Sequence, residues 1–108
     1  MSRRHGHTPK YSLKRIKELL AAGEDFYLIT QSARLGAQRL YMDDDDIVAC
    51  VWALGDDDYE TTLEGTRVPG TFQDVYRTRH HGFRIYLKVR LIGDHEAVII
   101  SFKQDTSA

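Results

Sequence analysis

A basic, strand-like stretch near the end of the chain offers the clearest chemistry in the sequence: residues 83–91 read F-R-I-Y-L-K-V-R-L. Successive side chains of a β-strand point to opposite faces, so Arg84, Tyr86, Lys88 and Arg90 are predicted to share one face. The apolar residues between them then form a wall of the hydrophobic core. A basic surface that also carries a tyrosine can bind a chain of phosphates, and it is the candidate functional surface of this protein.

Two neighbouring segments add polar groups to this surface. Residues 71–77 read T-F-Q-D-V-Y-R and place Gln73 and Arg77 on the same side of a strand, and residues 97–103, A-V-I-I-S-F-K, place Lys103 on the polar side. The same alternation predicts three residues of the last segment that point into the core: Val98, Ile100 and Phe102. If the strands pair, one face collects five polar side chains: Gln73, Arg77, Tyr86, Lys88 and Lys103.

These side chains suit one reaction, the cleavage of RNA by its own 2′-hydroxyl group. Lysine and arginine can stabilise the extra negative charge at phosphorus, and the loss of one such donor typically costs a factor of about 10²–10³ in rate. Tyrosine or lysine can transfer protons, which typically contributes about 10²–10⁴. The sequence has no zinc-binding spacing and no glycine-rich phosphate loop, so we expect neither a metal nor another cofactor. A solvated sheet surface is the alternative that the pattern leaves open.

Helices in the first half of the chain must support this surface. Ser12 and Gly23 are placed as the N-cap and C-cap residues of a first helix, with apolar residues at helical spacing between them. Thr30 is expected to cap a second helix, from Gln31 to about Leu40, in which Gly36 is a weak point.

A third helix is predicted after the acidic run Asp43–Asp46. Aspartates before a helix cap it and oppose its positive end, which stabilises it by roughly 0.3–1 kcal/mol per well-placed charge. A calcium loop is excluded, because the central glycine and the closing glutamate are missing. The apolar face of the helix is predicted to contain Ile47, Cys50, Val51 and Leu54. Cys50 is therefore interpreted as a core residue and not as a nucleophile.

The remaining segments are predicted to be short strands. Residues 24–29 form either a strand or a packed connector, and a strand at residues 59–63 precedes a loop at residues 64–70. The three basic segments follow, joined at residues 78–82, where His80 and His81 are expected in a solvated turn, and at residues 93–95. This order predicts an α+β fold, with N-terminal helices packed on a C-terminal antiparallel sheet.

Length and composition fit a single domain of 108 residues. We assign residues 10–105 to this domain and residues 1–9 to a flexible basic arm, in which His5 and His7 alone are a weak metal-binding candidate. No apolar run is long enough to cross a membrane, and the single cysteine suits the reducing cytoplasm. The net charge of −1 excludes a strongly basic nucleic-acid-binding protein but allows a locally basic face.

Several motifs occur in the order of a known family. T-P-K-Y-S-L stands before the first helix, and I-T-Q-S-A, F-Q-D-V-Y-R, Y-L-K-V and V-I-I-S-F-K follow. From about Pro9 to Lys103 the chain resembles the MqsR family of toxins, which belong with the RelE-like mRNA interferases of bacterial toxin–antitoxin systems. The resemblance implies a RelE-like fold and a metal-independent cytoplasmic endoribonuclease. Such an enzyme cleaves mRNA through the 2′-hydroxyl and is neutralised by a cognate antitoxin.

The resemblance also implies roles for residues of the basic face. The catalytic residues are predicted to be Gln73, Tyr86 and Lys103. Tyr86 and Lys103 are expected to transfer protons and stabilise charge, and Gln73 is expected to orient the phosphate. Arg77 fits a phosphate contact in the family. From their place on the basic strand face, Lys88 and Arg90 are predicted to bind RNA together with Arg77.

One position departs from the family. Members typically have a lysine in an F-Y-K-S-M segment, and counting back from Q-D-V-Y-R places it at Thr61, between Glu60 and Thr62. Either Lys88 or Arg67 compensates, or the protein is a slower or inactive relative. Two other functions therefore stay open: a module that binds RNA or an antitoxin without cutting, and a structural domain whose sheet edge pairs with a partner strand.

Overall fold

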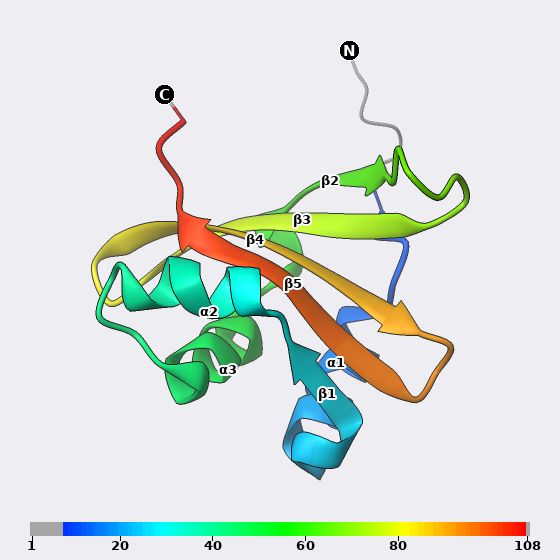
Figure 1. Cartoon of the computed structure of the whole chain (residues 1–108), viewed down its shortest axis with the longest axis horizontal. Helices are drawn as coiled ribbons and strands as arrows, with labels where there is room; N and C mark the ends of the chain where they lie inside the picture. Colours follow the sequence, from blue (N-terminus) through cyan, green and yellow to red (C-terminus); the bar gives the residue numbers. More distant parts are fainter. Residues whose placement is uncertain (1–7, 108) are drawn as a thin grey trace.

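The structure, a computed structural model, describes residues 8–107. A five-stranded sheet with the order β1-β5-β4-β3-β2 forms its centre (Figure 1). The strands are β1 (Tyr27–Ile29), β2 (Tyr59–Glu64), β3 (Phe72–His80), β4 (Phe83–Ile92) and β5 (Glu96–Gln104). The helices are α1 (Leu13–Ala22), α2 (Gln31–Gln38) and α3 (Asp44–Ala53), with short 3₁₀ turns η1 (Glu24–Phe26) and η2 (Asp56–Asp58). The predicted α+β fold is confirmed.

The sheet is an antiparallel meander with one added strand. Strands β2, β3, β4 and β5 pair antiparallel in chain order, as predicted. Strand β1, the end of the segment predicted as either a strand or a connector, pairs parallel with β5, so the sheet is mixed. The predicted turn at residues 78–82 is too long, because β3 continues to His80. His81 and Gly82 alone make the turn, with φ of 50° and 82°, as in the two-residue hairpin turns that match strand twist.

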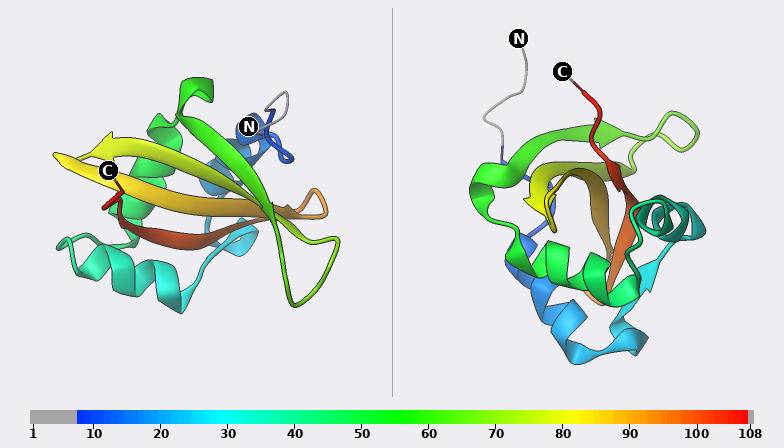
Figure 2. Two further views of the ribbon diagram at one scale, coloured as in Figure 1. Left: turned by 90° about the horizontal axis from the view of Figure 1, so that it is seen from above. Right: turned by 90° about the vertical axis from the view of Figure 1, so that its left-hand side faces the viewer.

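Helices α1 and α3 pack against one face of the sheet, which curves around them (Figure 2). Helix α1 begins at its predicted cap: the Ser12 hydroxyl accepts a hydrogen bond from the Arg15 backbone N–H at 3.1 Å. Helix α3 begins within the acidic run and not after it, with Asp43 as its cap. Asp43 and Asp46 each accept from the backbone N–H of the other, at 3.0 and 2.9 Å. The buried residues of the two helices are Ile16, Leu19, Leu20, Ile47, Cys50 and Val51. The predicted apolar faces are therefore the core faces.

Helix α2 lies against the edge of β5 (Figures 1 and 2). Thr30 caps it as predicted, accepting from the Ala33 backbone N–H at 3.1 Å, and its hydroxyl donates to the Ile100 carbonyl at 2.7 Å. Gly36 is buried, and a Cβ at this position would overlap the carbonyl oxygen of Phe102. Gly36 is thus needed for close packing of the helix against the strand, whatever it costs in helix propensity.

A β-bulge in β5 overturns part of the predicted alternation. Lys88 lies opposite Ser101, but the next residue, Val89, lies opposite Ile99, so the register shifts by one residue. Such an extra residue reverses the side-chain alternation on one side of the bulge. The residues of β5 in the core cluster are therefore Ala97, Ile99 and Phe102. The prediction was correct for Phe102 and wrong for Ile100. Val98 is buried, as predicted, but it lies opposite Arg90 and outside the main core cluster.

The segment before α1 is fixed to the sheet by a buried carboxylate. Asp74 is fully buried and accepts hydrogen bonds from the backbone N–H groups of Lys10 and Tyr11, at 2.9 and 2.8 Å, and from the Thr62 hydroxyl at 2.6 Å. Most of the predicted basic arm, with His5 and His7, lies outside the residues that the structure describes, so that prediction stays untested. Within residues 8–107, no helix is long and apolar enough to span a membrane.

Candidate functional site

The candidate site lies on the outer face of the sheet, which we define as the face opposite α1 and α3. Its centre is a row of three side chains on neighbouring strands, because Arg77 pairs with Tyr86 and Tyr86 pairs with Lys103. The guanidinium carbon of Arg77 lies 5.3 Å from the centre of the Tyr86 ring, and the Lys103 ammonium nitrogen lies 5.2 Å from it. Tyr86 thus stands between two cations, within the range of cation–π attraction.

A second row runs beside the first. Thr61 lies opposite Val75, Val75 opposite Lys88, and Lys88 opposite Ser101. The position at which the family typically has a lysine therefore faces the same surface as Tyr86. Of the two residues predicted to compensate, Lys88 lies in this row, two strands from Thr61. Arg67 lies in the exposed loop after β2.

Gln73 and Arg90 lie on the outer face but at its other end. Gln73 pairs with Leu63, and it precedes Arg77 on β3 by four residues. At about 3.3 Å per residue this is roughly 13 Å along the strand. Arg90 follows Tyr86 on β4 by four residues and pairs with Val98. All six predicted site residues share the outer face, but Gln73 and Arg90 are not in one cluster with Tyr86 and Lys103.

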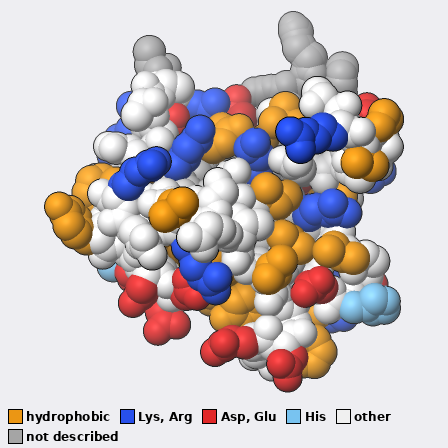
Figure 3. Space-filling model, viewed as in Figure 1, with side chains coloured by type: hydrophobic (Ala, Val, Ile, Leu, Met, Phe, Trp, Pro, Cys, Tyr) orange, Lys and Arg blue, Asp and Glu red, His pale blue; other side chains and the backbone are white. Residues whose placement is uncertain are grey.

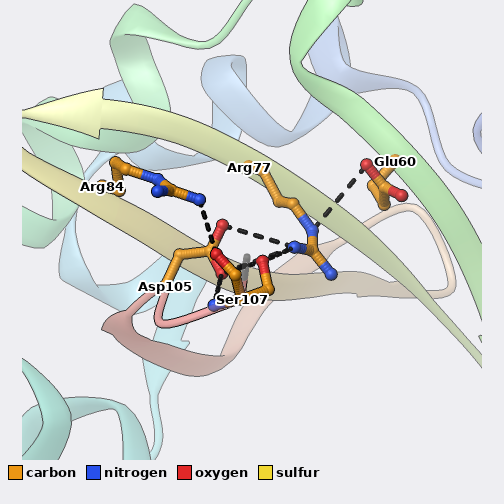
Figure 4. Close-up of polar contacts among 5 residues, drawn as sticks. All are labelled: Glu60, Arg77, Arg84, Asp105 and Ser107. Carbon is orange, nitrogen blue, oxygen red and sulfur yellow. Dashed lines mark hydrogen bonds and ion pairs between the residues drawn. The ribbon is translucent and has the colours of Figure 1, made fainter.

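Two carboxylates contact the guanidinium of Arg77 (Figure 4). Its Nη1 donates to both carboxylate oxygens of Asp105 at 3.4 Å and to the Ser107 hydroxyl, and its Nε lies 3.7 Å from a Glu60 oxygen. The Asp105 side chain is only 8% exposed. Hydrogen bonds from Ser107, with the charges of Arg77 and Arg84, lower the pKa of its carboxyl group.

The segment Asp105–Ser107 lies across the ends of β3 and β4. The Asp105 backbone N–H donates to the Arg84 carbonyl at 2.7 Å, and Arg84 Nη2 donates to the Ser107 carbonyl at 2.8 Å. Alternation along strands could not predict these contacts, because the segment follows the last strand. Arg77, predicted to contact phosphate, is therefore partly neutralised within the protein.

The lysines of the outer face differ from Arg77. In the part of the chain that the structure describes, neither Lys88 nor Lys103 forms an ion pair or donates a hydrogen bond. Charges on the whole surface are also separated: lysine and arginine side chains gather over the sheet, and acidic side chains gather around the helical end of the molecule (Figure 3). An anionic chain is thus attracted to the outer face and repelled by the opposite end.

His80, His81 and Cys50 lie away from this face. His80 ends β3 and alternates with Tyr76, so it faces the helices, and burial lowers its pKa. His81 lies 3.8 Å from an Asp46 oxygen on α3. The prediction that both are turn residues was therefore wrong for His80. Cys50 is 1% exposed and burial raises its pKa to about 12, which supports its assignment to the core and not to catalysis.

Outside this face, titratable side chains gather mainly in the two aspartate runs at residues 43–46 and 56–58. Residues 8–107 contain no group of three histidine, cysteine, aspartate or glutamate residues placed to hold a metal ion. The outer face, with its tyrosine between two cations, is the candidate active site.

The fold and the site define a class. Helices cover one face of a curved sheet and the other face presents a tyrosine among lysines and arginines, as expected of a RelE-like toxin. The family model described as "Motility quorum-sensing regulator, toxin of MqsA" matches residues 8–104. The mRNA interferase toxin MqsR of Escherichia coli (strain K12) is 33% identical over 97 residues, covering 90% of this chain and 95% of that protein. The chain therefore belongs to the MqsR toxin family.

Proposed function

We propose that this protein is an endoribonuclease toxin that cuts mRNA in the cytoplasm and is neutralised by a cognate antitoxin. Membership of the MqsR toxin family and the 33% identity to an mRNA interferase support the proposal. The structural observation that carries it is the row Arg77–Tyr86–Lys103, in which a phenol and an ammonium group stand side by side on an open basic face.

The chemistry follows from what RNA already contains. The 2′-oxygen attacks the adjacent phosphorus, its proton is removed, and the bond from phosphorus to the 5′-oxygen breaks as that oxygen takes a proton. The products are a 2′,3′-cyclic phosphate and a free 5′-hydroxyl. The protein has to align these atoms, move the protons and stabilise the negative charge that develops on the phosphate oxygens.

We assign these tasks to neighbouring residues. Lys103 has no internal carboxylate partner among residues 8–107, so its ammonium group is available to stabilise the phosphate oxygens. The Lys103 ammonium nitrogen lies 5.2 Å from the centre of the neighbouring Tyr86 ring, and we assign proton transfer to the Tyr86 hydroxyl. Lys88, in the adjacent row, contacts the next phosphate. Arg77 is already held by Asp105 and Glu60, and its role is to place positive charge beside the Tyr86 ring.

Gln73 and Arg90 receive a different role. Their place at the far end of the outer face, roughly 13 Å from the Tyr86 row, suits contacts to a neighbouring nucleotide better than contacts to the scissile phosphate. The Arg90 Nε is buried and has no hydrogen-bond partner within the described chain.

The test is cleavage of a purified mRNA in EDTA, with the product ends mapped. We expect 2′,3′-cyclic phosphate ends, and we expect Lys103→Ala to slow cleavage by about 10²–10³. Lys14→Ala is the matched control, because it removes the same charge from an exposed position on α1, where the side chain is 88% exposed. Cleavage that needs added magnesium, or equal rates for both variants, would contradict the proposal.

A second function is favoured by one specific observation. Thr61 stands on the outer face where the family typically has a lysine, and Glu60 and Asp105 neutralise Arg77 beside it. These features fit a protein that binds RNA or antitoxin with little cleavage. An RNA gel shift that persists under conditions where the mRNA stays intact would identify this case.

A further inference from the structure

We propose that the seam between α2 and β5 is a binding groove for the nucleotide beside the cleaved bond, with Arg39 as its principal phosphate-binding residue. This inference rests on the proposed nuclease function and extends it. The groove begins at Lys103, so it joins the outer face to the α2 side of the molecule without a break.

Two hollows meet along this seam. One has a volume of about 290 Å³ and the other of about 450 Å³, and both are lined by Gly36, Arg39 and Lys103. Binding sites for small ligands typically measure about 300–1,000 Å³, so together the hollows are large enough for a nucleotide. The larger hollow is also lined by Gln31, Ser32, Leu35 and Ser101.

The sequence of α2 builds one wall of the groove. Ser32, Leu35, Gly36 and Arg39 are spaced by three and four residues, so they share one face of the helix. Gly36 lets this face approach β5 so closely that a Cβ would overlap the Phe102 carbonyl oxygen. The larger side chains on either side of Gly36 therefore stand at the rim of the seam.

The groove has the mixed chemistry that a nucleotide requires. Leu35 is 45% exposed, which offers an apolar surface for the face of a base. The hydroxyl groups of Ser32 and Ser101 and the amide of Gln31 can bond to base edges or the ribose. Arg39 and Lys103 supply positive charge for the phosphates.

The charge of the groove selects an anion. Arg39, the C-cap residue of α2, forms no ion pair within residues 8–107, whereas Arg34 within the helix binds Asp44 at 2.9 Å. None of the residues that line either hollow is acidic. The hollow on the other side of α2 is lined by Asp43, Asp44 and Asp45 and would repel the same ligand.

Binding of an uncleavable oligoribonucleotide with 2′-O-methyl groups tests the groove apart from catalysis. We expect Arg39→Ala to weaken binding about tenfold, which is the loss of roughly 1.4 kcal/mol, and to lower the salt dependence by about one phosphate contact. Lys14→Ala, with the same change of charge, is expected to bind like the wild type. Equal binding by the two variants would overturn the inference.

Leu35→Glu is the second variant, since it places a carboxylate in the groove at an exposed position. We expect it to weaken binding more than Arg39→Ala does and to change which mRNA sites are cut. If the wild type is active and both groove variants cut the same mRNA sites, the groove does not bind the nucleotide, and the proposed function is unaffected. A wild type that never cuts RNA would remove the proposed function, and the binding assay would then decide on the groove alone.

Discussion

Polar side chains on the two faces of strands β3 and β4 differ in burial and in their partners. On the core face, Asp74 is fully buried and is satisfied by three donors from its own chain. On the outer face, Lys88 and Lys103 have no carboxylate partner within the described residues. A buried polar group without partners costs free energy, whereas an exposed polar group is solvated by water and can bind a ligand. Asp74 on the core face therefore serves folding, and Lys88 and Lys103 on the outer face are available for substrate.

Arg77 lies between these two cases. It belongs to the outer face, yet it contacts Asp105 and Glu60, as the core-face groups contact their own chain. The contrast shows that position on the outer face does not by itself make a residue a substrate contact. To contact the substrate, a charged side chain has to lie on this face and also lack an internal counter-charge.

The strongest test of the comparison makes one chemical change on each face. Tyr86→Phe is expected to reduce the cleavage rate by about 10²–10⁴, because a proton-transferring hydroxyl is lost. Tyr76→Phe removes a buried hydroxyl that has no hydrogen-bond partner in the described structure, so its cleavage rate is expected to stay within about twofold of wild type. Initial rates on the same mRNA compare the two. Equal losses would show that the faces are not functionally distinct.

Neighbouring residues on β3 test the same comparison through stability. Asp74→Ala leaves two backbone N–H groups and a hydroxyl without their acceptor, and we expect it to lower the free energy of unfolding by about 3 kcal/mol. Gln73→Ala, one residue earlier and on the outer face, is expected to change it by less than about 0.5 kcal/mol. Urea unfolding of both variants measures the difference. A mild effect of Asp74→Ala would mean that the segment before α1 is fixed by other contacts.

Local patterns were enough to predict the framework of the fold. Short-range sequence patterns determine the helix caps at Ser12, Thr30 and Asp43. The same holds for the alternating residues of β4. The β5 bulge could not be predicted, because alternation assumes a regular register. Gly36 was predicted only to weaken its helix. Its close contact with Phe102 could not be predicted, because Phe102 lies on a strand more than sixty residues away in the sequence.

The site was predicted less completely than the fold. Alternation correctly placed Tyr86, Lys88 and Lys103 on one face, because a period of two needs no tertiary information. It could not give the register between strands, so Gln73 was expected nearer to Tyr86 than it lies. It also could not reveal that Asp105 contacts Arg77, as this contact joins residues 28 positions apart.

A gain of function sharpens the comparison at the position that departs from the family. Thr61→Lys adds a cation to the outer face in the row of Lys88, and we expect it to raise the cleavage rate about tenfold, toward the effect of one added charge-stabilising donor. Leu63→Lys is the control, because Leu63 also lies on this face but pairs with Gln73 at the far end. If Thr61→Lys has no effect on a folded protein, Lys88 already supplies the missing charge.

The smallest expected effect concerns the carboxylate that neutralises Arg77. The pKa of Asp105 is lowered in the folded protein, chiefly by hydrogen bonds from Ser107. Folding is therefore stabilised by this group above its unfolded pKa of about 3.9, and the contribution is lost as the pH falls through the lowered folded value. Asp105→Asn is expected to be less stable than wild type by about 1 kcal/mol at pH 7, and the difference should shrink below pH 4.

Thermal unfolding between pH 2.5 and 7 measures this difference, and Thr106→Ala controls for disturbance of the same segment. Because Asp46 also has a lowered pKa, both proteins should lose stability in acid, and only the gap between them reports on Asp105. A gap that stays constant down to pH 2.5 would show that the ionisation of Asp105 does not contribute to stability. Arg77 would then be free to bind phosphate, and the distinction between paired and unpaired cations on the outer face would fail.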